Sequence, residues 1–327
     1  MTSYRFGTWC LVWCIATALA ATSHAATIIV NDSFTSEDRS DEPGDPLDAG
    51  WWSTTSSSGN SIEIDSNGLG LRSGTSGRGI RGIFPEQTLA VGDTITATYT
   101  FVTPATVGVD QSTDFRIGLY NSEVDPVNGT SADLEADLAA SSSNPNPLYE
   151  DIGGYMADYD VGFTAVPDDA NISIRERVTQ PAFAQSGRLM STTGSYDSLG
   201  GGTDIGDGYA FDQANTEYVG VLSVTRTAAG IVEIFSSLST GGSLVNSYSV
   251  VDDAADGAQH PGVTTSFSQL GFHAGTNAFG STNSADDPDN GITFTNVTIE
   301  VTRIPEPASM TLMLGTLAGL LIRGRRS

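Results

Sequence analysis

The segment Thr94-Ile95-Thr96-Ala97-Thr98-Tyr99-Thr100-Phe101-Val102 carries the pattern that decides the fold. Its apolar residues occupy alternate positions, and threonine fills most of the positions between them. Successive side chains of a β-strand point to opposite faces, so the alternation predicts a strand with one buried and one exposed face.

Similar stretches recur along the chain. Short β-branched or aromatic runs alternate with clusters of Gly, Ser, Asn and Asp, which is typical of antiparallel all-β proteins. We expect further strands at 27–30, 61–64, 115–120, 154–163, 171–178, 218–227, 231–238, 243–250, 269–273 and 292–302.

Two tight turns fix the local topology of the segment 218–250. Arg226-Thr227-Ala228-Ala229-Gly230 predicts a hairpin with Gly at a positive φ, and Thr240-Gly241-Gly242 predicts a second turn. Three consecutive strands joined so closely form a meander. The only helical pattern outside the termini is the short run 131–140, which we place in a long loop.

So many strands with so few helices must stack or close on themselves to bury their apolar faces. We therefore expect one all-β domain, 27–303, folded as an antiparallel two-sheet β-sandwich, with no repeat or linker dividing it. An N-terminal signal helix and a C-terminal hydrophobic helix flank the domain.

The ends of this domain resemble those of a known fold family. An opening strand runs into Asn31-Asp32-Ser33-Phe34, and the chain closes the domain with Ile292-Thr293-Phe294-Thr295-Asn296-Val297 and its continuation. This layout is similar to the concanavalin A-like and laminin-G-like jelly rolls. The resemblance implies that the first and last strands pair, and that the architecture is lectin-like and permits a carbohydrate ligand.

The N-terminus has the features of an export signal. Arg5 precedes the mostly apolar run 6–20, and small residues before Ala26 predict cleavage after Ala25. Both cysteines, Cys10 and Cys14, lie in this segment. The mature chain, 26 onward, would therefore have no disulfide or thiolate metal site.

The C-terminal tail, 304–327, has three parts. Pro305-Glu306-Pro307 precedes the uncharged run 308–322, and Arg323, Arg325 and Arg326 follow it. This tail resembles the PEP-CTERM sorting signal of Gram-negative bacteria, which implies a transient inner-membrane anchor through the helix 308–322 and cleavage by an exosortase-type protease after signal peptidase has acted. The alternative is an ordinary C-terminal membrane anchor.

Charge limits the set of partners. The chain has 14 arginines, no lysine and 39 acidic residues, and four of the arginines lie in the two terminal signals. The domain is therefore strongly acidic, which makes nucleic acid and anionic head groups poor partners. Because the acids are dispersed along the sequence, we interpret them as a solvated surface.

Catalytic motifs are few. Of the three histidines, His24 lies in the signal, and His260 and His273 do not stand at a metal-ligand or triad spacing. Glu63 and Asp65 share one face of a strand, as in family 16 glycoside hydrolases, but the second Glu of that motif is replaced by the run 66–68. We therefore predict no catalytic residues, and a salt-bridge ladder for the group Arg175-Glu176-Arg177.

Two ligand types remain open. Calcium could bind Asp-rich loops, chiefly Asp286, Asp287 and Asp289, although turn chemistry also explains such loops, and no other cofactor is expected. The adjacent Trp51 and Trp52 should point to opposite faces, so that one packs in the core and the other could contact a glycan.

Three functional classes follow from these observations. The first is a non-enzymatic cell-surface or matrix protein with a structural or adhesive role in exopolysaccharide or biofilm. The second is a carbohydrate-binding, lectin-like module that uses calcium. The third is a glycoside hydrolase or polysaccharide lyase on the same fold.

Overall fold

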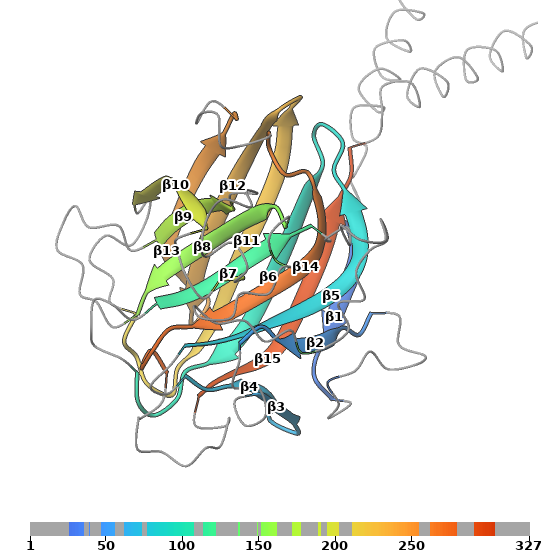
Figure 1. The fold of residues 1–327 in the computed structure, drawn as a ribbon. Coiled ribbons are helices and arrows are strands. Elements are labelled where there is room, and N and C mark those ends of the chain that lie inside the picture. The colour runs from blue at the N-terminus through green and yellow to red at the C-terminus, as the bar shows by residue number, and fades with distance from the viewer. Residues whose placement is uncertain are drawn as a thin grey trace, which may run out of the picture. The chain divides into compact units, whose positions relative to one another are not determined.

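A computed structural model describes most of the expected domain (Figure 1). The described residues are 26–35, 39, 47–55, 62–73, 77–107, 114–121, 137, 149, 152–161, 172–177, 189–190, 195–202, 211–254, 262–279 and 291–304. One compact unit spans Thr27–Val301. A second unit combines Met1–Ala26 with Thr302–Ser327, and its described residues are Ala26 and 302–304.

The unit Thr27–Val301 is an antiparallel two-sheet β-sandwich, as predicted, and its strands form two layers (Figure 1). The first sheet has eight strands in the order β13-β12-β11-β6-β15-β4-β3, with β1 pairing beside β15. Its strands are β1 (Ala26–Asp32), β3 (Ile62–Asp65), β4 (Gly68–Leu71), β6 (Thr94–Val102), β11 (Glu217–Ala228), β12 (Ile231–Thr240), β13 (Ser243–Asp252) and β15 (Ile292–Thr302).

The second sheet has seven strands in the order β10-β9-β8-β7-β14-β5-β2. Its strands are β2 (Gly50–Ser53), β5 (Arg78–Thr88), β7 (Asp114–Tyr120), β8 (Gly154–Asp160), β9 (Ile172–Arg177), β10 (Tyr196–Gly202) and β14 (Ser266–Ala274). In Figure 1, β7, β8 and β14 cross in front of the strands of the eight-stranded sheet.

Strand β6 confirms the pattern read from the sequence. Ile95, Ala97, Tyr99 and Phe101 are fully buried, whereas the residues between them are partly exposed. The buried side faces the other sheet. There, Phe294 of the eight-stranded sheet meets Phe272 of the seven-stranded sheet with ring centroids 4.3 Å apart. Packing of this kind between two inner sheet faces is the main source of stability in a sandwich.

The meander and the terminal pairing are also confirmed. Strands β11, β12 and β13 are neighbours in the sheet, and their turns place Gly230, Gly241 and Gly242 at φ values of 75°, 55° and 76°. Strand β1 pairs with β15, as the jelly-roll resemblance implies. The helix expected at 131–140 lies outside the described residues, apart from Asp137.

The sequence analysis missed four strands, namely β2, β4, β5 and β10. Glycines and a buried arginine interrupt the alternation of apolar and polar residues that would identify such strands in the sequence. In β5, Arg81 is fully buried, and Gly82 leaves room for the Trp51 ring, whose atoms would lie 3.0 Å from an added Cβ. In β10, Gly200 has a φ of 157° and the register shifts between Ser198 and Gly200.

Candidate functional site

Charged and polar side chains cluster on the outer surface of the seven-stranded sheet. In β7, Phe115, Ile117 and Leu119 face the other sheet, so Arg116 and Tyr120 must face outward. The same alternation in neighbouring strands brings more polar groups to this side. We call this surface the covered face, and it consists of Arg81, Arg116, Tyr120, Met156, Asp158, Arg175 and Arg177.

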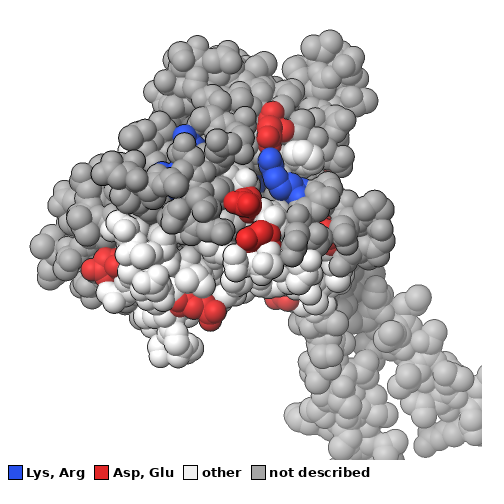
Figure 2. Space-filling model, turned by 90° about the horizontal axis from the view of Figure 1, so that it is seen from below, with Lys and Arg blue, Asp and Glu red and all other residues white. Residues whose placement is uncertain are grey.

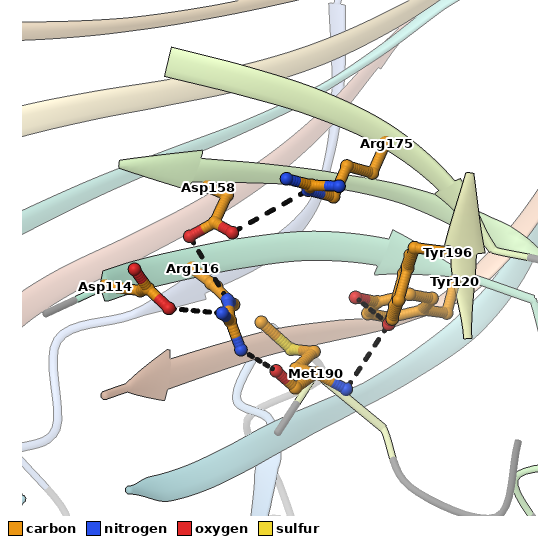
Figure 3. A network of polar contacts seen from close by, with 7 residues as sticks. All are labelled: Asp114, Arg116, Tyr120, Asp158, Arg175, Met190 and Tyr196. Atoms are coloured by element: carbon orange, nitrogen blue, oxygen red, sulfur yellow. Dashed lines mark hydrogen bonds and ion pairs between the residues drawn. The ribbon is translucent and has the colours of Figure 1, made fainter. Parts of the chain in front are cut away.

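An ion-pair ladder crosses three strands of the covered face (Figure 3). Arg116 binds Asp114 on its own strand, and its Nε lies 3.1 Å from Asp158 Oδ1 on β8. Asp158 Oδ2 lies 3.8 Å from Arg175 Nε on β9. The remaining terminal nitrogen of Arg116 donates to the Met190 carbonyl at 2.8 Å.

Burial governs the titration of this ladder. It raises the pKa of Asp114 to about 6, and repulsion by Asp158 adds to the rise, whereas Arg116 and Arg175 oppose it. Burial likewise raises the pKa of Asp158 against the pull of the two arginines. For Arg116, burial disfavours the charge, but Asp158 and Asp114 outweigh it and raise the pKa.

A tyrosine pair continues the network beside the ladder (Figure 3). The hydroxyls of Tyr120 and Tyr196 lie 2.9 Å apart, and the Met190 backbone N–H donates to the Tyr196 hydroxyl at 3.3 Å. Burial raises the pKa of Tyr120 well above its ordinary value. Met190 itself has a φ of 62°, so the chain adopts an uncommon conformation where it meets both parts of the network.

The chain itself covers this face. Tyr149, Ile152, Leu189 and Met190 form a second apolar cluster with Tyr120, Met156 and Tyr196. Arginines hold the covering residues in place. The Arg81 guanidinium lies 5.6 Å from the centroid of the Tyr149 ring, and Arg177 donates to the Tyr149 carbonyl while lying 5.4 Å from the Tyr196 ring. The charged groups therefore fix chain segments in place.

The expected ladder at 175–177 is confirmed for Arg175, which pairs with Asp158. Glu176 points between the sheets, where its charge contributes to a raised pKa of Tyr155 after burial and Asp252. Arg177 contacts the two covering tyrosines described above. The sequence analysis did not identify Arg116, Asp158 or Tyr120, because nothing in their spacing shows that their strands are neighbours.

The two adjacent tryptophans point to opposite faces, as predicted. Trp51 is 1% exposed, and its indole N–H donates to Asp32 at 2.6 Å. Asp32 also accepts the Phe34 backbone N–H, and burial raises its pKa to about 6. The Asn31-Asp32-Ser33-Phe34 motif therefore anchors Trp51 in the core.

Trp52 lies on the outer side of the edge strand β2 and is partly exposed. The Arg39 guanidinium lies 6.0 Å from the centroid of its ring. Arg39 in turn pairs with Asp137 at 2.5 Å. Among the described residues, the buried indole nitrogen of Trp52 has no hydrogen-bond partner. Trp52 is thus the tryptophan that remains a candidate glycan contact.

The carboxylate pair Glu63 and Asp65 lies on β3, an edge strand of the other sheet. Glu63 is exposed, and Asp65 accepts hydrogen bonds from the backbone and side chain of Asn67 at 2.8 and 3.0 Å. Asp65 therefore caps the β3–β4 turn. His273 is buried on β14 opposite Arg116, whereas His260 lies outside the described residues.

Several predicted sites fall outside the described residues. These are Ala25 at the cleavage site, Asp286, Asp287 and Asp289 of the calcium candidate, and the sorting residues Pro305, Glu306, Pro307, Arg323, Arg325 and Arg326. Ala26 is described and is exposed on β1. Within the described residues, no group of three or more His, Cys, Asp or Glu could hold a metal ion, and no helix is long and apolar enough to cross a membrane.

The fold and the site define an all-β sandwich with one polar, self-covered outer face. No protein-family model and no curated protein sequence matches the chain. Among solved structures, the chain is similar to an endo-1,3-β-glucanase from Streptomyces sioyaensis, with a TM-score of 0.46, 10% identity, and 85% of this chain and 97% of that chain covered.

Two further similar structures are lectins. Lectin I from Ulex europaeus, in complex with the methyl glycoside of α-L-fucose, gives a TM-score of 0.42 at 10% identity and covers 86% of this chain and 99% of that chain. The Ca²⁺- and Man2-bound exoplasmic domain of VIP36 gives 0.40 at 10% identity, with 84% and 90% covered. These likenesses concern the arrangement of strands and assign no ligand or reaction to this chain.

Proposed function

We propose that this chain is an exported, non-catalytic protein of the cell surface or extracellular matrix, with a structural or adhesive role in exopolysaccharide. The observation that carries the proposal is the self-covered ladder on the seven-stranded sheet. Arg116 and Asp158 are buried and pair with each other, and Arg116 also binds the Met190 carbonyl, so these charges are satisfied within the fold. Acid–base catalysis would require carboxyl groups that a substrate can reach.

The tail and signal sequences support the export part of the proposal. Signal peptidase would cleave after Ala25, so that the mature chain begins at Ala26. An exosortase would recognise Pro305, Glu306 and Pro307 together with the terminal arginines. The helix 308–322 would hold the chain in the inner membrane until this cleavage. A strongly acidic, lysine-free domain suits release into a hydrated matrix, because net charge keeps a protein soluble.

Terminal mapping tests this proposal. The intact mass of the protein from the surface and medium of its native host should correspond to a start at Ala26 and an end near 305–307. A variant lacking 323–327 should show altered processing with an unchanged fold of the domain. Recovery of a chain that retains 308–327 would overturn the sorting part of the proposal and leave a plain membrane anchor.

A second candidate is a carbohydrate-binding module, which Trp52 favours. The Trp52 ring lies on the edge strand β2, has a buried N–H unpaired among the described residues and has the charged Arg39 near it; it could stack on a sugar ring if Arg39 moves aside. Calcium at Asp286, Asp287 and Asp289 would then order the loop that carries them. The glycosidase alternative rests on Glu63 and Asp65, and Asp65 already caps a turn.

A glycan array separates this candidate from the first. Trp52→Ala should abolish binding to the glycans that the unaltered chain retains, because the stacking surface is lost. Trp52→Phe is the matched control and should keep most of the binding. Equal binding by both variants would exclude Trp52 as the contact.

A further inference from the structure

The outer surface of the eight-stranded sheet differs in kind from the covered face. At its centre, β6, β11 and β12 present outward side chains in aligned rows. Most of these side chains bear a hydroxyl, and we call this surface the hydroxyl face. Its outward residues are Thr94, Thr96, Thr98, Thr100, Val219, Val221, Ser223, Thr225, Glu233, Phe235, Ser237 and Ser239.

Cross-strand register sets the regularity of this array. Thr96 is opposite Ser223, which in turn is opposite Phe235, and Thr98 is opposite Val221 in the next row. Outward side chains therefore stand roughly 6.8 Å apart along each strand and about 4.8 Å apart between strands. Hydroxyls occupy most positions at this spacing, and Val219, Val221 and Phe235 lie among them.

Several of these hydroxyls are available for a ligand. Thr94 and Thr225 pair with each other at 2.9 Å. By contrast, the side chains of Thr96, Thr98 and Ser223 make no hydrogen bond to another described residue, and all three are partly exposed. A hydroxyl can donate and accept at once, so a row of them suits a partner that is itself rich in hydroxyls.

Charge narrows the choice of partner. The chain has a net charge of −25, yet the hydroxyl face carries only Glu233, at its corner, and is bordered by Glu217, the next outward residue of β11. Figure 2 shows acidic side chains scattered singly over one side of the described surface. An anionic polymer would be repelled by the field of the whole chain, and a cationic partner would find only Glu233 and the bordering Glu217 to pair with on this face. A neutral polymer meets neither obstacle.

We propose that the hydroxyl face binds a neutral polysaccharide. This inference rests on the proposed matrix function and names the class of polymer. Threonine is suited to the task because each side chain offers a methyl group and a hydroxyl, which match the C–H and O–H groups of a sugar ring. Binding on this face would leave the opposite sheet, with Trp52 at its edge, unoccupied.

Affinity electrophoresis of the mature protein tests the proposal. The gels contain hydroxyethylcellulose, dextran or galactomannan as neutral probes, and carboxymethylcellulose as an anionic polymer on the same backbone as the first. We expect retardation by at least one neutral probe. The variant Thr96→Val/Thr98→Val/Ser223→Ala should bind that probe about tenfold or more weakly, because three hydrogen-bonding groups are lost without a change of shape.

A matched variant and a size measurement make the outcome decisive. Thr88→Val/Ser266→Ala removes a hydroxyl pair 3.1 Å apart from the seven-stranded sheet and should bind as before. Full binding by the triple variant, or no retardation by any neutral probe, would overturn the proposal. So would a triple variant that changes only the sedimentation coefficient, since the face would then serve a second copy. Terminal mapping of the secreted chain tests the matrix function independently.

Discussion

The covered face and the hydroxyl face lie on either side of one core and differ in their polar groups: the first holds buried charges and the second holds mainly neutral hydroxyls. On the covered face, Arg81, Arg116 and Arg177 are buried and contact the chain's own Tyr149 or Met190, and Asp158 is buried beside Arg116. On the hydroxyl face, most of the threonines and serines remain partly exposed, and the charges are Glu233 and the bordering Glu217. The difference teaches that the charges of the covered face serve internal attachment, whereas the hydroxyl face offers mainly neutral groups to the surroundings.

The physical reason is desolvation. A buried charge is tolerated only when it is paired and hydrogen-bonded, so each arginine of the covered face specifies where a covering segment must lie. An exposed hydroxyl loses little free energy when it exchanges a hydrogen bond to water for a hydrogen bond to another hydroxyl. The hydroxyl face can therefore exchange water for another hydroxylated partner without a large penalty.

The largest expected effect comes from breaking the ladder. Arg116→Met keeps much of the side-chain volume but leaves Asp158 buried with only the 3.8 Å contact to Arg175. The free energy of unfolding should fall by about 3–5 kcal/mol, as measured by urea denaturation. Thr98→Val on the hydroxyl face is the control and should stay within about 0.5 kcal/mol of the unaltered chain. Equal effects at the two sites would contradict the contrast between the faces.

A smaller effect should appear in the pH dependence. The pKa of Asp114 is about 6 when folded, against an ordinary value of about 3.9. Between these pH values the folded chain binds more protons than the unfolded chain, so the free energy of unfolding should fall as pH rises from about 4 to about 6.

Asp114→Asn should flatten this slope, because the amide does not titrate. Some slope should remain, since burial also raises the pKa of Asp32 to about 6. Urea denaturation at pH 4, 5, 6 and 7 measures both slopes, with Thr98→Val as the variant that should follow the unaltered chain. Parallel curves for Asp114→Asn and the unaltered chain would show that Asp114 titrates normally.

The smallest expected effect is on the hydroxyl face itself. Thr94→Val removes one member of the pair with Thr225, which lies in a partly exposed position, so the free energy of unfolding should fall by only about 0.5 kcal/mol. A double-mutant cycle with Thr225→Val measures the coupling directly. A coupling above about 2 kcal/mol would mean that this face is stabilised as strongly as the covered one.

Sequence reasoning succeeded where one side of a strand is buried and the other is not. The threonine-alternating β6 and the glycine turns of the β11–β13 meander were predictable because a single period and two turns define them. It failed for β5 and β10. In β5, the buried Arg81 stands at a position where the alternating pattern predicts an exposed residue. In β10, Gly200 and Gly202 have no side chain where the Tyr248 ring of β13 packs against them, so the strand shows no apolar alternation.

The site was less predictable than the fold. Arg175 could be assigned to a ladder from its own neighbours in sequence, but its partner Asp158 and the next arginine, Arg116, come from two other strands. Periodicity reveals which face a side chain occupies and does not reveal which strand lies beside it. The opposite orientations of Trp51 and Trp52, by contrast, follow from strand geometry alone.

The place of β15 in the eight-stranded sheet bears on how the protein is made. This strand lies between β6 and β4 and also pairs with β1, although it is the last strand to leave the ribosome. Synthesis adds about 5–20 residues each second. During this time β6 and β4 have been made but lack β15, the strand that pairs with both. Until residue 302 emerges, the sheet has a gap at its centre. The eight-stranded sheet can therefore be completed only after almost the whole domain has been synthesised.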